Sequence, residues 1–220
     1  MSYCRGKTPE YASARFATVG DPLSQSIAAR IADSREIAQL ACVAGLGLYE
    51  FLFDDLIPLM KAADFLAAGV ASEDLPISYR NCCVATASET IVGSANVFPT
   101  DALKNEDYAF VPSDRIDHIR SMLELQDWGS MFLNTLAVSE AHRGSGIGIR
   151  LLGWARTRAR EAGFDRLSLH VWADNTSALR FYEAQGFVRQ GVATVPPHPR
   201  LPRKGGSILM RQIISGGGAS

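Results

Sequence analysis

The chain alternates between two spacings of apolar residues, one typical of strands and one typical of helices. Strand-like runs, rich in β-branched and apolar residues, fall at 26–31, 79–87, 91–98, 130–138, 166–172, 187–195 and 206–213. Helix-like runs, in which apolar residues recur every three or four positions, fall at 33–45, 59–68, 116–125, 147–163 and 173–185. This order of elements predicts an α/β (α+β) fold.

Local signals set some of the boundaries. Asp33 and Glu36 have the spacing of a capping box at the start of the first helix run, and Gly69 closes the second. Between these two helices, 48–56 is apolar apart from three acidic residues.

The segment 99–115 is rich in Pro, Asp and Asn, which indicates a loop. With the short helix run after it, this loop forms an insertion at 99–128. We expect 26–214 to be a single domain, preceded by an arm at 1–25 and followed by a frayed tail at 215–220.

Composition restricts the possible partners. With 220 residues and 47% hydrophobic content, the chain can bury one sizeable core. The net charge of -1 gives no basic field for nucleic acid or an acidic membrane surface, so we expect neither as a partner. No apolar run approaches the roughly 18 residues of a membrane span, and the first 25 residues lack a signal-peptide core. The expected location is therefore the cytoplasm.

Cysteines and histidines do not suggest a metal site. No C-x-x-C pair occurs, and adjacent Cys82 and Cys83 are interpreted as small buried residues on opposite faces of a strand. The histidines are isolated from one another in the sequence and are interpreted as surface or strand residues: His118, His142, His170 and His198. We expect no metal.

A glycine loop lies between the strand 133–138 and the helix run that follows it. Gly144, Gly146 and Gly148 let the backbone turn sharply and approach a ligand closely. Because unpaired N–H groups point outward at a helix start, this loop predicts an anion site, to which Arg143 adds a positive charge.

Spacing separates three kinds of phosphate loop. A P-loop needs G-K-[ST], but Gly148 is followed by Ile149, and a dinucleotide fingerprint needs its third glycine at position 149. Arg143, Gly146 and Gly148 match R-x-x-G-x-G, so the segment resembles the loop of the GNAT superfamily of N-acetyltransferases. This resemblance implies a central mixed, mostly antiparallel sheet with strands splayed around an acyl-CoA site.

The resemblance also implies how acetyl-CoA would bind as co-substrate. The backbone of Leu136, Ala137 and Val138 would pair with the pantetheine arm and polarise the thioester oxygen. The pyrophosphate would lie on the loop, whose expected binding residues are Arg143, Gly144, Ser145, Gly146, Ile147, Gly148 and Ile149.

A second motif supports the same family. The segment 175–187, N-T-S-A-L-R-F-Y-E-A-Q-G-F, resembles the signature N-x-x-A-x-x-x-Y-x-x-x-G-F of that superfamily. Asn175 and Tyr182 are about two helical turns apart and share one side of the helix. The resemblance makes Asn175 a hydrogen-bond partner of the cofactor arm and Tyr182 the acid that protonates the CoA sulfur.

The sequence does not identify the general base. The central strand offers Asn134 and Thr135 where many relatives have a carboxylate. A water chain is one alternative; the side-chain candidates are Glu50, Asp54, Asp55, Glu124 and Asp127. Of these, Glu50 is counted as a candidate catalytic residue. If 48–56 is helical, Glu50 and Asp54 would share a face and favour a cationic acceptor.

We therefore predict an acetyl-CoA-dependent N-acetyltransferase that acts on a primary amine of a small molecule or an exposed amino group by direct attack in a ternary complex. Two alternatives are the transfer of another acyl group and a non-catalytic acyl-CoA-binding module. The sequence leaves open the oligomeric state, with a homodimer as one option.

Overall fold

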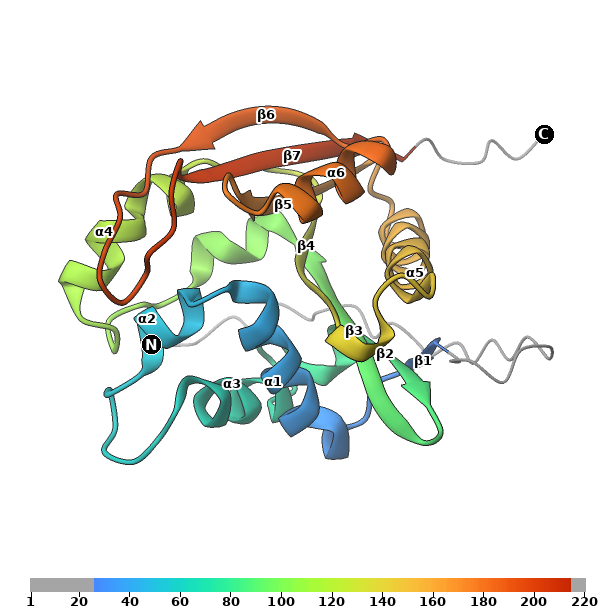
Figure 1. The fold of residues 1–220 in the computed structure, drawn as a ribbon, viewed down its shortest axis with the longest axis horizontal. Coiled ribbons are helices and arrows are strands. Elements are labelled where there is room, and N and C mark those ends of the chain that lie inside the picture. Colours follow the sequence, from blue (N-terminus) through green and yellow to red (C-terminus); the bar gives the residue numbers. More distant parts are fainter. Residues whose placement is uncertain (1–25, 215–220) are drawn as a thin grey trace, which may run out of the picture.

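A computed structural model describes residues 26–214, and its centre is a seven-stranded sheet (Figure 1). The strands lie in the order β1-β2-β3-β4-β5-β7-β6. Their bounds are β1 Ser26–Ala28, β2 Cys82–Ala87, β3 Thr90–Pro99, β4 Met131–Val138, β5 Arg166–Trp172, β6 Val188–Ala193 and β7 Ser207–Ile213. All neighbours are antiparallel except β4 and β5, so the sheet is mixed and mostly antiparallel, as predicted.

Helices cover both faces of this sheet (Figure 1). The α-helices are α1 Ser34–Gly45, α2 Leu48–Phe53, α3 Ala62–Ala71, α4 Ser113–Glu124, α5 Ile147–Glu161 and α6 Thr176–Ala184. Helices α5 and α6 pack on one face, and α1 and α3 pack on the other. The predicted arm at 1–25 and tail at 215–220 lie outside the described residues, and no helix within 26–214 has the length and apolarity needed to cross a membrane.

The main core lies between the sheet and α5. The predicted apolar stripe of this helix is confirmed, because each of its five members is at most 3% exposed: Ile147, Leu151, Leu152, Ala155 and Ala159. Burying a leucine side chain contributes about 2 kcal/mol, so Leu151 and Leu152 fix the helix firmly. Cys83 joins this core, whereas Cys82 joins the cluster on the opposite face, as their neighbouring positions in a strand predict.

The parallel pair β4 and β5 separates almost as soon as it forms. Their register contains only Met131 opposite Leu167 and Phe132 opposite Ser168. In its pairing with β3, strand β4 carries a bulge, where Asn96 faces Thr135 and Val97 faces Leu133. Asn134 is the extra residue, and a bulged strand bends. The rest of β4 therefore diverges from β5, and its backbone on that side does not pair with β5.

Several predicted boundaries are wrong. Strand β1 ends at Ala28, and Ile31–Asp33 forms a 3-10 turn instead of continuing the strand. Asp33 is at the predicted N-cap position of α1, but its side chain makes no capping hydrogen bond there; its carboxylate accepts the N–H of Arg30 at 2.7 Å, before the helix.

The second predicted helix begins and ends later than expected. Leu59 has a positive φ of 66°, which interrupts the helix, and Asp54 Oδ1 accepts the N–H of Ala62 at the true start of α3. Gly69 therefore lies inside α3 rather than beyond its end.

The insertion at 99–128 is more ordered than its composition indicates. It contains a 3-10 helix at Thr100–Asn105 as well as α4, which begins three residues before the predicted helix. Asp127 holds its end to the sheet: Arg211 on β7 donates to this carboxylate from Nε at 2.7 Å and from Nη2 at 2.6 Å, and Arg166 on β5 donates at 3.2 Å.

We expect Asp127→Asn to destabilise the fold. The Asp127 side chain is 3% exposed. Its loss of charge leaves the half-buried guanidinium group of Arg211 without its anion and that of Arg166 with only the exposed Asp165, at 3.3 Å. The free energy of unfolding should fall by about 2 kcal/mol, measured by urea denaturation. As a matched control, Asp117→Asn removes an exposed partner of Arg120 and should change this free energy by less than about 0.5 kcal/mol. Equal effects of the two variants would contradict the anchoring role.

Candidate functional site

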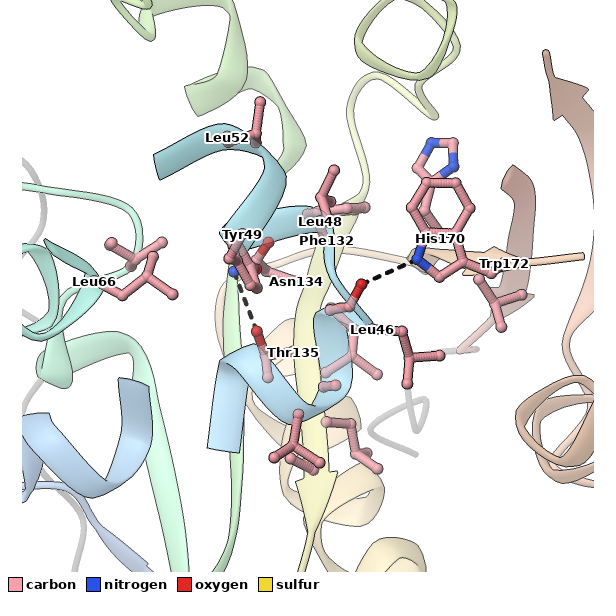
Figure 2. A pocket seen from close by; sticks show the side chains of 18 of the residues that line it. Leu46, Leu48, Tyr49, Leu52, Leu66, Phe132, Asn134, Thr135, His170 and Trp172 are labelled. Atoms are coloured by element: carbon pink, nitrogen blue, oxygen red, sulfur yellow. Dashed lines mark hydrogen bonds between the residues drawn. The ribbon is translucent and has the colours of Figure 1, made fainter. Parts of the chain in front are cut away.

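A cavity of about 1420 Å³ occupies the space that the divergence of β4 from β5 opens. It runs from the glycine loop before α5, past β4 and α6, to α2, α3 and the insertion. Figure 2 shows its middle, where Tyr49 of α2 lies beside Asn134 and Thr135 of β4. Residues from distant parts of the sequence therefore share one cavity.

The glycine loop forms one end of the cavity. Gly146 is the N-cap of α5, with φ of 81°, and Gly144 has φ of 78°. A Cβ built on either glycine would meet no atom within 4 Å, so open space lies in front of the first turn of α5. A Cβ on Gly148 would lie 3.6 Å from the ring of Phe181, where α5 and α6 approach each other. The loop thus has the bare backbone and helix N-terminus of an anion site.

Most of the predicted loop residues reach the cavity. Its lining includes Arg143, Gly144, Gly146, Ile147, Gly148 and Ile149. Ser145 is not among the lining residues; its hydroxyl donates to the carbonyl of His142 at 2.6 Å, which stabilises the turn.

Strand β4 forms the side wall of the cavity. Leu136, Ala137 and Val138 all line it, as predicted from the sequence. Upstream, the Asn134 amide donates to Asn96 Oδ1 at 3.1 Å and to Thr135 Oγ1 at 3.4 Å. These amide and hydroxyl groups carry no charge, so this part of the strand offers hydrogen bonds but no carboxylate.

Tyr49 was not identified as a site residue from the sequence. Burial raises the pKa of its hydroxyl, and hydrogen bonds to Thr135 and Asn134 oppose this rise. Tyr49 lies in the apolar run 48–56, where an aromatic residue is as typical of the hydrophobic core as of a binding site, so the sequence does not distinguish the two roles.

Helix α6 brings both of its predicted residues to the cavity. Asn175 is the N-cap of α6, and its Oδ1 accepts the N–H of Ala178 at 3.2 Å. Tyr182 is 9% exposed, and burial raises the pKa of its hydroxyl well above the usual value of a tyrosine. Its ring packs between Phe181 and Phe187 at centroid distances of 5.2 and 5.4 Å. The hydroxyl is therefore held in its protonated form.

Glu50 and Asp54 are not brought to the cavity. Helix α2 ends at Phe53, and Asp54 has extended backbone, so the two residues do not share a helical face as expected. Neither is a lining residue, and Asp54 Oδ1 is taken by the start of α3. Arg200 contacts Asp55 at 3.1 Å, so this acidic segment also has a cationic neighbour. Within 26–214, Glu50 Oε2 is buried without a hydrogen-bond partner, and the charge of Glu50 adds to the larger effect of burial in raising the pKa of the adjacent Tyr49. The role of Glu50 as a base stays a prediction.

The end of the cavity opposite the glycine loop is apolar and aromatic. Phe53, Phe65 and Phe110 stack there, with centroid distances of 4.7 Å between the first two and 5.4 Å between the last two. The carboxylates among the lining residues are those of Glu106 and Asp107. Burial raises the pKa of Glu106. No motif or spacing in the sequence indicates this glutamate, which lies in an irregular part of the insertion.

The histidines are less isolated than the sequence indicated. The rings of His118 and His198 lie 5.3 Å apart, and both contact Phe51. His170 Nε2 donates to the carbonyl of Leu125 at 2.8 Å, and burial lowers its pKa to about 4. Within 26–214, no group of three or more metal-ligating side chains is found.

Comparisons with known proteins agree with this geometry. The model of a family described as "Acetyltransferase (GNAT) family" matches residues 53–187. A curated relative, N-alpha-acetyltransferase 40 of Saccharomyces cerevisiae, is 44% identical over 85 residues, which cover 34% of this chain and 30% of that protein. The chain thus matches about a third of the length of this relative.

Solved structures share the fold. An N-acetyltransferase of Staphylococcus aureus Mu50 is similar with a TM-score of 0.62 and 18% identity, over 85% of this chain and 99% of that one. The protein yncA of Salmonella typhimurium, solved with its cofactor acetyl-CoA, has a TM-score of 0.55 and 15% identity, over 90% and 97% of the two chains. The predicted GNAT fold is confirmed.

His170 generates a prediction about pH and stability. Its pKa in the folded protein, about 4, lies below its ordinary value of 6.5. The unfolded chain therefore binds more protons between these values, and stability is lost as pH falls from 6.5 towards 4. Between pH 7.5 and 5 the lost free energy of unfolding from this residue is about 2 kcal/mol. In urea denaturation, His170→Gln should lose correspondingly less stability over this range, and an identical loss in both proteins would contradict the prediction.

Proposed function

Because the chain belongs to the acetyltransferase (GNAT) family and is an acyltransferase, we propose that it transfers acetyl from acetyl-CoA to a primary amine of a small molecule or an exposed amino group. The family uses acetyl-CoA and acts on amine acceptors. The single observation that supports the proposal is one cavity that joins the glycine loop, the unpaired side of β4 and the Tyr182 side chain.

The glycine loop fits the pyrophosphate of acetyl-CoA. Gly144 and Gly146 have no Cβ, and open space lies where a Cβ would point, so the pyrophosphate could approach the backbone there. The N–H groups at the start of α5 and the exposed Arg143 would meet the negative charge. Ser145 would act indirectly, through its bond to His142.

The middle of the cavity fits the pantetheine arm and the thioester. Acetyl-CoA supplies the activated acetyl group. Backbone groups of Leu136, Ala137 and Val138, which do not pair with β5, would bind the arm as an added strand and polarise the thioester oxygen. Asn175, at the start of α6, would hydrogen-bond to the same arm.

The proposed transfer is a direct attack in a ternary complex. The lone pair of a neutral amine forms the new C–N bond to the acetyl carbon, and the C–S bond breaks with its electrons on sulfur. The amine nitrogen loses one proton, which water would carry to Tyr182 to restore the hydroxyl after it has protonated the sulfur, so the net products are the N-acetyl amine and CoA with a free thiol. Tyr182, whose raised pKa keeps it protonated, would donate its hydroxyl proton to the sulfur.

Two other functions give different results in the same assay. Transfer of a longer acyl group would make a longer acyl-CoA the better donor, and a binding module would release no CoA with any amine. The deciding experiment measures CoA release with a panel of amines and several acyl-CoAs. Release that is fastest with acetyl-CoA supports the proposal.

Gly146→Asp should weaken binding of acetyl-CoA by about 10-fold or more, about 1.4 kcal/mol, because it places a carboxylate where the pyrophosphate would lie. Gly163→Asp is a matched control: that glycine also has φ of 81° and open space at its Cβ, but it follows the far end of α5. Isothermal titration calorimetry on the two folded variants measures the difference. Equal affinity in both would contradict the assignment of the loop.

Tyr182→Phe should lower kcat by roughly 10- to 1,000-fold and leave the Kd of acetyl-CoA nearly unchanged, since the hydroxyl acts mainly in the transition state. Steady-state kinetics and calorimetry measure the two quantities. Phe181→Leu, at the adjacent position, controls for disturbed packing around the ring. An unchanged kcat in Tyr182→Phe, with chemistry rate-limiting, would remove this residue from the mechanism.

A further inference from the structure

The aromatic wall of the cavity, which we define as Phe53, Phe65 and Phe110, is built from three separate segments. Phe53 ends α2, Phe65 belongs to α3, and Phe110 comes from the insertion. The rings stack with interplanar angles between 22° and 29°. Phe110 nevertheless remains 53% exposed, so the wall has a free apolar surface at the rim of the cavity.

Two adjacent carboxylates, those of Glu106 and Asp107, line this side of the cavity. Asp107 is exposed, and its Oδ1 accepts the N–H of Ala109 at 2.8 Å, which uses it within its own turn. Glu106 is half-buried, and within 26–214 its carboxylate has no hydrogen bond or ion pair. The Glu106 carboxylate is therefore available to a ligand that supplies a hydrogen-bond donor or a positive charge.

Glu106 lies close to the aromatic end. Its charge helps to raise the pKa of Tyr108 to about 12, after the larger effect of burial, and Tyr108 also lines the cavity. Phe110 follows two residues later. One short segment of the insertion thus presents an anionic group, a phenol and an exposed ring to the same space.

Resting on the proposed function, we propose that the acceptor is a primary amine with a single positive charge on an aromatic or bulky apolar body. Its ammonium group contacts Glu106, and its body packs on the aromatic wall. The contact partner of the ammonium group is thus Glu106, and not the pair Glu50 and Asp54 that the sequence suggests for a cationic acceptor, because neither of those residues lines the cavity.

The two contacts select for different properties of the acceptor. The wall favours a flat apolar group, because stacked rings gain energy beyond their buried area. Among the residues that line this end, only Asp107 carries a second carboxylate, and this group is exposed and accepts a hydrogen bond in its own turn, so a second ammonium group buried in the cavity would lack an equivalent partner there. Small arylalkylamines and peptides with an aromatic first residue share this chemistry.

The experiment measures kcat/KM and acetyl-CoA affinity with four acceptors: 2-phenylethylamine, ethanolamine, 1,4-diaminobutane and a short peptide that begins with Phe. We expect 2-phenylethylamine to exceed ethanolamine and 1,4-diaminobutane by about 10- to 100-fold. Comparison of 2-phenylethylamine with the peptide shows whether a small arylalkylamine or a peptide with an aromatic first residue is the better acceptor. Equal kcat/KM for ethanolamine and both aromatic acceptors would overturn the inference.

Variants assign the preference to residues. Phe110→Ala should lower kcat/KM for 2-phenylethylamine by about 10-fold and leave that for ethanolamine within about 3-fold. The control is Trp128→Ala, an exposed aromatic residue of the same insertion that does not line the cavity. Unchanged selectivity in Phe110→Ala would overturn the role of the wall.

Glu106→Gln should lower kcat/KM for all amines by about 10- to 100-fold without changing the Kd of acetyl-CoA. Glu89→Gln, an exposed glutamate in the turn between β2 and β3 that does not line the cavity, is the matched control. Equal effects of these two changes would overturn the ammonium contact. A chain that binds acetyl-CoA and transfers acetyl without apolar preference refutes this inference alone, whereas a chain that does not bind acetyl-CoA refutes the proposed function as well.

Discussion

The separation of β4 from β5 is the constraint on which the rest of the site depends. The two strands pair only at Met131 and Phe132, and a chain of buried hydroxyls holds this closed end. Ser130 Oγ lies 2.7 Å from Ser168 Oγ and 2.8 Å from Thr100 Oγ1, so β4, β5 and the insertion are tied together at one point. Beyond that point the bulge at Asn134 bends β4 away. A rigid closed end beside a bent strand keeps the gap open without a ligand.

The same gap explains why backbone, rather than side chains, provides most of the proposed cofactor site. Strand β4 exposes unpaired peptide groups along the gap, and α5 starts at its mouth with glycines of positive φ. Peptide groups recognise a pantetheine arm and a pyrophosphate with little dependence on side-chain identity. The side chains of α5 are left to the core, where Leu151 and Leu152 are fully buried and fix the position of its N-terminus.

The residues of the proposed cofactor half could be identified from local motifs in the sequence, whereas the residues of the proposed acceptor end could not. The glycine loop and the segment from Asn175 to Tyr182 are continuous, and their spacing reflects one local geometry, so the structure brings both to the cavity. The acceptor end joins α2, α3 and the insertion through tertiary contacts that leave no period in the sequence. Asp54 is an example. A helix over 48–56 would place Asp54 on the same face as Glu50, but the Asp54 carboxylate instead accepts the N–H of Ala62 at the start of α3. Local hydrogen bonding thus overrode the helical period.

The acceptor end also has to resolve a conflict inherent in the reaction. A carboxylate attracts an ammonium group but raises its pKa, whereas only the neutral amine can attack. Apolar surroundings act in the opposite direction, because they disfavour the charged form of the amine. In the proposed complex, Glu106 beside the aromatic wall would combine the two effects: its carboxylate would orient the nitrogen, and the burial that raises the pKa of Glu106 would also disfavour the charged form of the amine. A second carboxylate would strengthen binding and at the same time hold the amine in its unreactive form, so a single half-buried glutamate suits an acetyl acceptor better than an acidic cluster does.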